Sequence, residues 1–222
     1  MTDTVCADRN QTVRLSELFF SLQGEAARSG LPTVFIRLTG CPLRCSWCDT
    51  EYAFTGGTTT GIEDILTEVA RFPTRYVCVT GGEPLAQKTC LPLLTALCDA
   101  GYDVCLETSG ALDIASVDPR VARIMDLKAP GSGESSKNLL SNIDALRPTD
   151  EVKIVVASRA DYDWAKAMIS THGLAVRCDV VLSPVAGQLN PTDLAQWILD
   201  DGLAVRFQIQ LHKLLWSDAR GK

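Results

Sequence analysis

The sequence is poor in histidine, in aromatic residues and in long hydrophobic runs, and each shortage excludes a class of protein. Its only two histidines, His172 and His212, lie far apart and do not form the short-spaced pair that zinc modules use. Aromatic residues make up 6 %, no basic run accompanies them, and the net charge is −6, which disfavours a nucleic-acid partner. No run approaches the ~18 apolar residues of a membrane span. We therefore expect neither nucleic acid nor membrane as a partner.

The length and hydrophobic content suit one domain. A chain of 222 residues with 46 % hydrophobic residues can bury the core of a single α/β domain over 1–222. The polar N-terminus contains no apolar segment long enough for a signal peptide. We expect residues 1–12 to form a flexible tail and the protein to be cytoplasmic.

Three of the nine cysteines are clustered. An odd number of cysteines, mostly within apolar patterns, is a poor disulfide framework. Six are interpreted as incidental, several of them as small buried hydrophobes: Cys6, Cys78, Cys90, Cys98, Cys105 and Cys178. Cys41, Cys45 and Cys48 instead share the spacing C-x3-C-x2-C in "TGCPLRCSWCDTEY". This spacing indicates a site for a soft metal.

The three thiolates favour an iron–sulfur cluster over zinc. Structural zinc requires a fourth ligand, and the sequence offers no second Cys or His pair. A 4Fe-4S cluster held by three cysteines leaves one iron open for chemistry. With Trp47 before the last cysteine, the motif resembles that of the radical S-adenosylmethionine (SAM) enzymes. A non-catalytic iron–sulfur or zinc binding module is the alternative from a different class.

The remaining pattern predicts alternating strands and helices. Short apolar runs indicate strands at residues 33–40, 75–82, 102–110, 121–130, 151–158 and 178–185, with a seventh strand-like run at 205–212. Helical patterns begin at Gly61, Lys88, Ser135, Ala160 and Pro191. These are too few units for a full eight-unit barrel. We predict a partial, open TIM-like α/β barrel of about six βα units, of radical SAM type, with a helical layer trimmed between the third and fourth strands.

Polar motifs follow the predicted strands at their carboxyl ends. "TGGEP", "ETSG", "DLKAP" and "SPVAG" each come after a different strand, and so does the cysteine loop. The carboxyl ends of parallel strands meet at one edge of the sheet, where α/β folds build their sites. We therefore expect the motifs to converge.

The radical SAM resemblance implies a role for several of these residues. Gly81, Gly82 and Glu83 would meet the amino end of SAM, whose amino and carboxylate groups would chelate the open iron. By the same resemblance, Glu107 and Ser109 would lie near the ribose and Ser183 near the cofactor. A reduced cluster would then cleave SAM to methionine and a 5′-deoxyadenosyl radical.

Arg37 stands in the middle of an apolar strand-like run, "TVFIRLTG". A buried guanidinium without an anionic partner is costly. The partner could be Glu25 or a substrate carboxylate, which an arginine fork matches with two hydrogen bonds. A purely structural salt bridge, or an outward-facing arginine, is the alternative.

Further stretches extend the resemblance over nearly the whole chain. "FFSLQGEAARSG", "CDT", Arg37, "TGGEP" and "LHKLLW" resemble the 7-carboxy-7-deazaguanine synthase family. That resemblance implies a lyase of queuosine and deazapurine biosynthesis, which contracts 6-carboxy-5,6,7,8-tetrahydropterin to 7-carboxy-7-deazaguanine with loss of ammonia. It also implies the site residues: Gln23, Glu25, Arg37, Thr80 and His212 would contact the pterin, and Thr50 would bind Mg²⁺. We expect His212 to share one strand face with Gln208 and Gln210.

Partners and a rival enzyme complete the expectations. An exposed barrel flank favours a homodimer, and analogy favours a flavodoxin-like electron donor. The rival is a glycyl-radical-enzyme activase, which shares the cysteine motif. Such activases carry a "DGPG" stretch upstream, whereas this chain has "LQGEAARSG".

Overall fold

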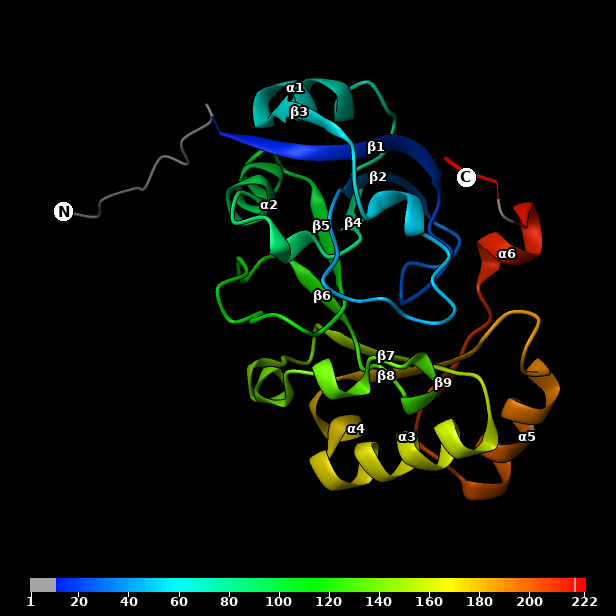
Figure 1. Cartoon of the computed structure of the whole chain (residues 1–222). Helices are drawn as coiled ribbons and strands as arrows, with labels where there is room; N and C mark the ends of the chain where they lie inside the picture. Colours follow the sequence, from blue (N-terminus) through cyan, green and yellow to red (C-terminus); the bar gives the residue numbers. More distant parts are fainter. Residues whose placement is uncertain (1–10, 218) are drawn as a thin grey trace.

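A nine-stranded sheet forms the centre of the molecule (Figure 1). The computed structural model describes residues 11–217 and 219–222. The strands are β1 (Thr12–Leu22), β2 (Pro32–Leu38), β3 (Thr58–Gly61), β4 (Tyr76–Gly81), β5 (Asp103–Thr108), β6 (Ala122–Asp126), β7 (Glu151–Val156), β8 (Asp179–Pro184) and β9 (Arg206–Phe207). The α-helices are α1 (Ile62–Val69), α2 (Cys90–Asp99), α3 (Arg159–His172), α4 (Leu174–Arg177), α5 (Pro191–Asp201) and α6 (Leu211–Trp216). No helix in these ranges combines the length and apolarity needed to cross a membrane.

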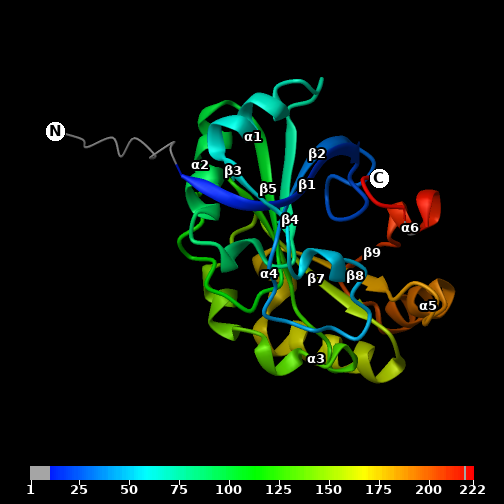
Figure 2. The ribbon, with the colours of Figure 1, turned by 45° about the horizontal axis from the view of Figure 1, so that its top comes forward.

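The sheet is mostly parallel and does not close. From β2 through β4 to β9 the strands pair in parallel and in chain order, while β1 pairs antiparallel with both β2 and β3. β3 and β9 form its two ends, and Figure 2 shows the sheet curving between them. The prediction of a partial, open barrel is confirmed.

The helices cover the outer face in two groups (Figure 1). α1 and α2 pack their apolar faces on the first half of the sheet, where Val34, Val77 and Leu97 belong to one core. α3, α4 and α5 pack on β7 and β8 around a second core that contains Ile154 and Tyr162. Both cores exclude water from the outer face, so the inner face remains available for a site.

Two strands were missed by the sequence analysis. β1 begins at Thr12, the last residue of the predicted tail; the rest of that tail, except Gln11, lies outside the described residues. Most of its side chains are half-buried or exposed, so it lacks the apolar run that marked the other strands. β3 is a four-residue edge strand of Thr and Gly whose apolar content gave no signal.

The trimmed helical layer is confirmed, and it is wider than predicted. No helix lies between β5 and β6. The α-helix predicted from Ser135 is wrong, because this segment forms only 3-10 turns at Ser135–Lys137 and Leu140–Ala145. Buried Asn142 donates to the carbonyls of Gly110 and Leu112, at 3.2 and 2.8 Å, and thereby ties the segment to the chain after β5. These bonds hold the segment in place against the connection from β5 to β6.

The inner face of the sheet changes character along the strands. Side chains alternate between faces with a period of two. Near the strand centres the inward positions are apolar, and Phe35, Cys78, Cys105 and Ile124 form a small cluster there with Ala26 from the segment between β1 and β2. Two residues further along each strand, the inward positions carry Arg37, Thr80, Glu107 and Asp126. A polar layer therefore lies directly above an apolar floor.

Candidate active site

A cavity of about 720 Å³ opens at the carboxyl edge of the sheet. This volume falls within the ~300–1,000 Å³ typical of small-ligand sites. Its wall contains residues of the cysteine loop and of the four motifs that follow β4, β5, β6 and β8. The predicted convergence of these motifs is therefore confirmed.

The cysteine loop places its three thiols on this cavity. Cys41, Cys45 and Cys48 are partly buried, free of disulfides and part of the cavity wall. Burial raises the pKa of each thiol, and Lys128 opposes this for all three. Binding of a soft metal would therefore release their protons.

Three free thiols on one cavity wall suit an iron–sulfur cluster. Within the described ranges, no three His, Cys, Asp or Glu side chains converge closely enough to hold one metal ion. Thiolates of an iron–sulfur cluster bind different irons and need not meet at one point. Four of the other cysteines are buried, as expected for small hydrophobes: Cys78, Cys90, Cys105 and Cys178. Cys98 is half-buried, and Cys6 lies outside the described residues.

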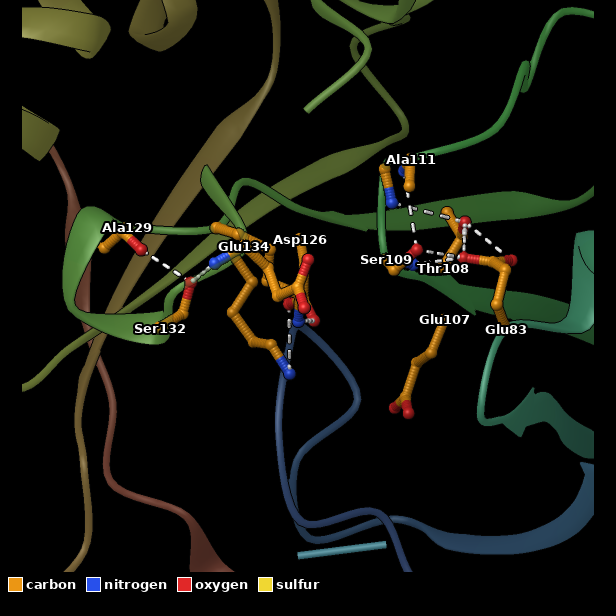
Figure 3. A network of polar contacts seen from close by, with 12 residues as sticks. Glu83, Glu107, Thr108, Ser109, Ala111, Asp126, Ala129, Ser132 and Glu134 are labelled. Carbon is orange, nitrogen blue, oxygen red and sulfur yellow. Dashed lines mark hydrogen bonds and ion pairs between the residues drawn. The ribbon is translucent and has the colours of Figure 1, made fainter. Parts of the chain in front are cut away.

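Glu83 connects two of the motifs rather than facing the cavity (Figure 3). Its carboxylate is fully buried and accepts hydrogen bonds from the Thr108 hydroxyl and from the Ser109 amide and hydroxyl. It also accepts from the Leu85 amide in its own turn. These bonds connect "TGGEP" to "ETSG" and hold the two turns together at the carboxyl edge of the sheet.

Glu107 points away from this network (Figure 3) and joins two predicted substrate residues. One oxygen accepts from Gln23 Nε2 at 3.1 Å, and the other accepts from the Thr80 hydroxyl at 2.9 Å. The side-chain oxygen of Gln23, Oε1, in turn accepts a hydrogen bond from the Gly24 backbone amide. This bond fixes the orientation of the Gln23 side-chain amide. The Thr80 hydroxyl therefore keeps its lone pairs for another donor.

Arg37 has a carboxylate partner, but it is Glu17 and not Glu25. Its Nε donates to Glu17 Oε1 at 2.7 Å, and the Tyr52 hydroxyl donates to the same oxygen. The terminal nitrogens of Arg37 make no hydrogen bond to another described residue, although the side chain is only 16 % exposed and lines the cavity. The salt bridge thus leaves the fork of the guanidinium available to an anion.

Glu25 pairs instead with Lys153, and a row of alternating charges extends from there along the cavity wall. Lys153 Nζ lies 2.5 Å from Glu25 Oε2 and 3.4 Å from Asp126 Oδ1. Lys128 Nζ lies 2.6 Å from Asp126 Oδ2. Burial opposes ionisation of Asp126, but Lys128 and Lys153 lower its pKa below the usual range. The row therefore stays charged.

Asp49 anchors the predicted magnesium ligand. Thr50 donates its hydroxyl proton to Asp49 Oδ1 at 2.8 Å. Burial opposes ionisation of Asp49, yet His212, Thr50 and Lys213 lower its pKa well below the ordinary value. The oxygen of Thr50 keeps its lone pairs, as a neutral metal ligand requires.

His212 lies on the cavity wall, but on helix α6 and not on a strand. Pairing with β8 ends at Gln208, because β8 itself ends at Pro184, which has no amide proton. The chain then bonds to the segment after β1, through Leu211 N to Gly24 O at 3.0 Å. The expectation of one strand face shared by Gln208, Gln210 and His212 is wrong for this reason.

Most predicted site residues meet at this cavity. The wall contains Gln23, Glu25, Arg37, Thr50, Thr80, Gly81, Gly82, Glu107, Ser109 and His212 in addition to the cysteines. Glu83 and Ser183 are fully buried behind the described wall. The Ser183 hydroxyl finds no hydrogen-bond partner among the residues with defined positions.

Several residues of the cavity wall were not selected from the sequence. They are Asp49, Asp126, Lys128, Lys153 and Gln210. Glu17, which lies behind the wall and pairs with Arg37, was not selected either. Lys153 could have been found, because it interrupts the apolar run "EVKIVV" as Arg37 interrupts its own strand. Asp126 and Lys128 belong to "DLKAP". The sequence analysis predicted that this motif lies at the carboxyl edge of the sheet, but it assigned no individual residue of the motif to the site. Glu17 gave no signal.

A model of the Radical SAM superfamily matches residues 35–166, which is more than half of the chain. The matched range contains the three cysteines and the motifs after β4, β5 and β6. The fold and the site therefore define a member of the Radical SAM superfamily.

Curated relatives narrow the family. A 7-carboxy-7-deazaguanine synthase from Chlorobaculum tepidum is 49 % identical over 213 residues, covering 94 % of this chain and 97 % of the relative. The enzyme of that name from Koribacter versatilis is 40 % identical over 220 residues, covering 92 % and 97 %. The chain belongs to the 7-carboxy-7-deazaguanine synthase family, as its sequence motifs suggested.

Solved structures agree on the fold. The crystal structure of QueE from Escherichia coli superposes with a TM-score of 0.72 at 24 % identity, covering 90 % of this chain and 95 % of that one. Streptococcus suis SuiB bound to S-adenosylmethionine gives a TM-score of 0.52 at 12 % identity, covering 80 % and 47 %. At these sequence identities, both similarities show that the folds are alike.

Gly82 allows the cysteine loop to lie against the turn after β4. A Cβ atom at Gly82 would lie 2.7 Å from Cys41 Cβ and even closer to Gly40 O. We expect Gly82→Ala to cost about 1–3 kcal/mol of stability and to displace the loop. Iron bound per chain after anaerobic reconstitution should fall severalfold.

The control is Gly202→Ala, where an added methyl meets no atom within 4 Å but the left-handed φ of +56° makes alanine unfavourable. It therefore lowers stability away from the site, and separates a loss of stability from a displaced cysteine loop. Its iron content should equal that of the wild type. Full iron loading in Gly82→Ala would show that the close approach is dispensable.

Proposed function

We propose that this chain is a radical SAM lyase that converts 6-carboxy-5,6,7,8-tetrahydropterin to 7-carboxy-7-deazaguanine and ammonia. The observation that carries the proposal is that one cavity is lined both by three free thiols and by a set of polar side chains that includes Arg37. Family membership supports the same reaction. Substrate and product differ by one ammonia, so the conversion needs no net oxidant.

The donor set suits the cofactors that the superfamily uses. Three cysteines can hold a 4Fe-4S cluster and leave one iron for the amino and carboxylate groups of SAM. When bound, this pair supplies the radical that starts the reaction. Gly81 and Gly82 line the cavity, and a Cβ atom on either would collide with the backbone of Leu38 or Gly40. Their lack of side chains therefore lets the end of β2 and the cysteine loop lie against this turn.

The polar layer suits a carboxylated pterin. The free end of the Arg37 guanidinium matches a carboxylate, while Glu25 and Glu107 accept from ring N–H groups. The apolar floor of Phe35 and Ile124 excludes water beneath the ring. Each polar side chain is already held by a neighbour, which reduces the entropic cost of ordering it on binding.

We also propose Mg²⁺ at Thr50, with substrate oxygens and water completing its shell. Support comes from the hydrogen bond to Asp49, which leaves the Thr50 lone pairs available. A cytoplasmic homodimer with a flavodoxin-like electron donor, serving queuosine or another deazapurine, completes the proposal. The open flank of the sheet supports the dimer, analogy supports the donor, and the resemblance supports the product.

The cysteine assignment and the reaction are tested together. Anaerobically purified wild type should contain about four irons per chain and form the carboxy-deazaguanine from SAM, a reductant and the carboxypterin. Replacing Cys41, Cys45 or Cys48 with Ala should abolish the iron, the brown colour and SAM cleavage. Cys98→Ala is the control and should retain all three. If the wild type binds iron and cleaves SAM but leaves the carboxypterin unchanged, the proposed substrate is wrong.

Arg37 should recognise the substrate carboxylate. Arg37→Ala should raise KM on the order of 30-fold or more, because losing one partner of a buried ion pair costs on the order of 2–5 kcal/mol. Arg37→Lys should rescue little, since it lacks the planar fork.

Glu17→Gln separates this role from the salt bridge. It weakens the bond to Arg37 Nε but keeps the guanidinium, so its KM should rise much less. A tetrahydropterin without the 6-carboxylate should bind poorly to the wild type, and Arg37→Ala should no longer discriminate against it. If Arg37→Ala discriminates against the pterin without the 6-carboxylate as strongly as the wild type does, Arg37 stabilises the fold and does not recognise the carboxylate.

Thr50 should affect magnesium and not the cluster. Thr50→Ala removes one oxygen ligand, so the Mg²⁺ concentration for half-maximal turnover should rise about tenfold while iron content stays constant. Thr67→Ala, on the exposed face of α1, is the control. Overlapping titrations of Thr50→Ala and wild type would make Thr50 a turn residue.

A further inference from the structure

Lys153 is a buried cation of the cavity wall to which the family resemblance gave no role. It lies on β7 with 9 % of its surface exposed, and its ammonium contacts Glu25 from the segment between β1 and β2. The two residues are 128 positions apart in sequence. Lys153 therefore links the second half of the sheet to a segment that carries two predicted substrate residues, Gln23 and Glu25.

Of the two carboxylates that form salt bridges with Lys153, Glu25 depends on it more. Asp126 has its own cation, since Lys128 Nζ lies 2.6 Å from Asp126 Oδ2. Lys153 lies 3.4 Å from Asp126 Oδ1, and that oxygen accepts no hydrogen bond among the described residues. Among the salt bridges of the described residues, Lys153 is the only cation that pairs with Glu25.

Lys153 acts as a fixed positive charge. Burial alone would lower its pKa, but the carboxylates of Asp126, Glu25 and Glu107 raise it well above the ordinary value. An amine that stays protonated is neither a base nor a nucleophile. Its effect on the reaction is thus limited to charge and position.

Both oxygens of Glu25 are held. Oε2 contacts Lys153, and Oε1 accepts from Gln210 Nε2 at 2.8 Å. A carboxylate has about four lone-pair sites, so each oxygen keeps one acceptor position. A pterin presents two adjacent donors, the ring N3–H and the 2-amino group, which match the two oxygens of one carboxylate.

We propose that Lys153 is a positioning residue for substrate recognition, whose ammonium holds Glu25 so that its carboxylate accepts the adjacent N–H donors of the pterin ring. This inference rests on the proposed function. It adds a residue that acts on the substrate only through Glu25.

The test is a double-mutant cycle in the iron-loaded enzyme. Lys153→Met removes the charge and keeps most of the volume. It should raise KM for the carboxypterin about tenfold to a hundredfold, the range for a lost hydrogen bond to a charged group, with kcat changed less than about threefold. In the Glu25→Gln background the same substitution should change KM less than about threefold, because the residue through which it acts is already altered.

A substrate analogue gives a second readout that a structural role would not affect. A carbonyl in place of the 2-amino group removes the pair of adjacent donors. Wild type should discriminate strongly against this analogue, and Lys153→Met should discriminate much less. Lys153→Arg keeps the charge and should recover part of the discrimination.

Lys166→Met is the matched control, since Lys166 pairs with Asp201 on the outer helices and should leave KM unchanged. If Lys153→Met is not recovered as a folded protein, Lys153→Gln, which also removes the charge, replaces it in the cycle under the same criteria. Equal effects of the Lys153 substitution in both backgrounds would overturn the inference and make Lys153 a structural cation. A wild type that cleaves SAM without converting the pterin would instead refute the proposed function, and the inference would fall with it.

Discussion

The alternation of side chains along parallel strands is the constraint on which the site depends. Phe35 and Arg37 face the same side of β2, and their register with β4 places Phe35 beside Cys78 and Arg37 beside Thr80. The same shift of two residues separates Cys105 from Glu107 on β5 and Ile124 from Asp126 on β6. Because β2, β4, β5 and β6 make the change from apolar to polar at the same height, an apolar floor and a polar layer form across these four strands.

A polar layer inside a protein is stable only if its charges are paired. Arg37 has Glu17, Glu25 has Lys153, and Asp126 has Lys128, with the partner always supplied by another segment or by the end of the same strand. An uncompensated charge at this depth would cost several kcal/mol. The same pairs that satisfy burial also fix the direction of each side chain, so the site is largely arranged before any ligand binds.

The rim is held by hydrogen bonds where the helical layer is missing. No α-helix covers the connections from β5 to β6 and from β6 to β7. Glu83 instead ties the turns after β4 and β5 together, and Asn142 ties the later segment to the carbonyls after β5. Both side chains are buried and carry several bonds each, which substitutes for the packing that a helix would give.

The sequence by itself determined the cysteine triplet, the chain order of the seven parallel strands and the motifs at the carboxyl ends of several of them. These features are local: a spacing, an apolar run or a turn signal is complete within about ten residues. Only the tertiary structure decided that Glu25 pairs with Lys153 and Arg37 with Glu17, that Glu83 joins two turns, and that His212 lies on a helix. Each of these depends on sheet register or on contacts between distant segments. No local pattern encodes them, because the partners meet only when the strands between them have paired.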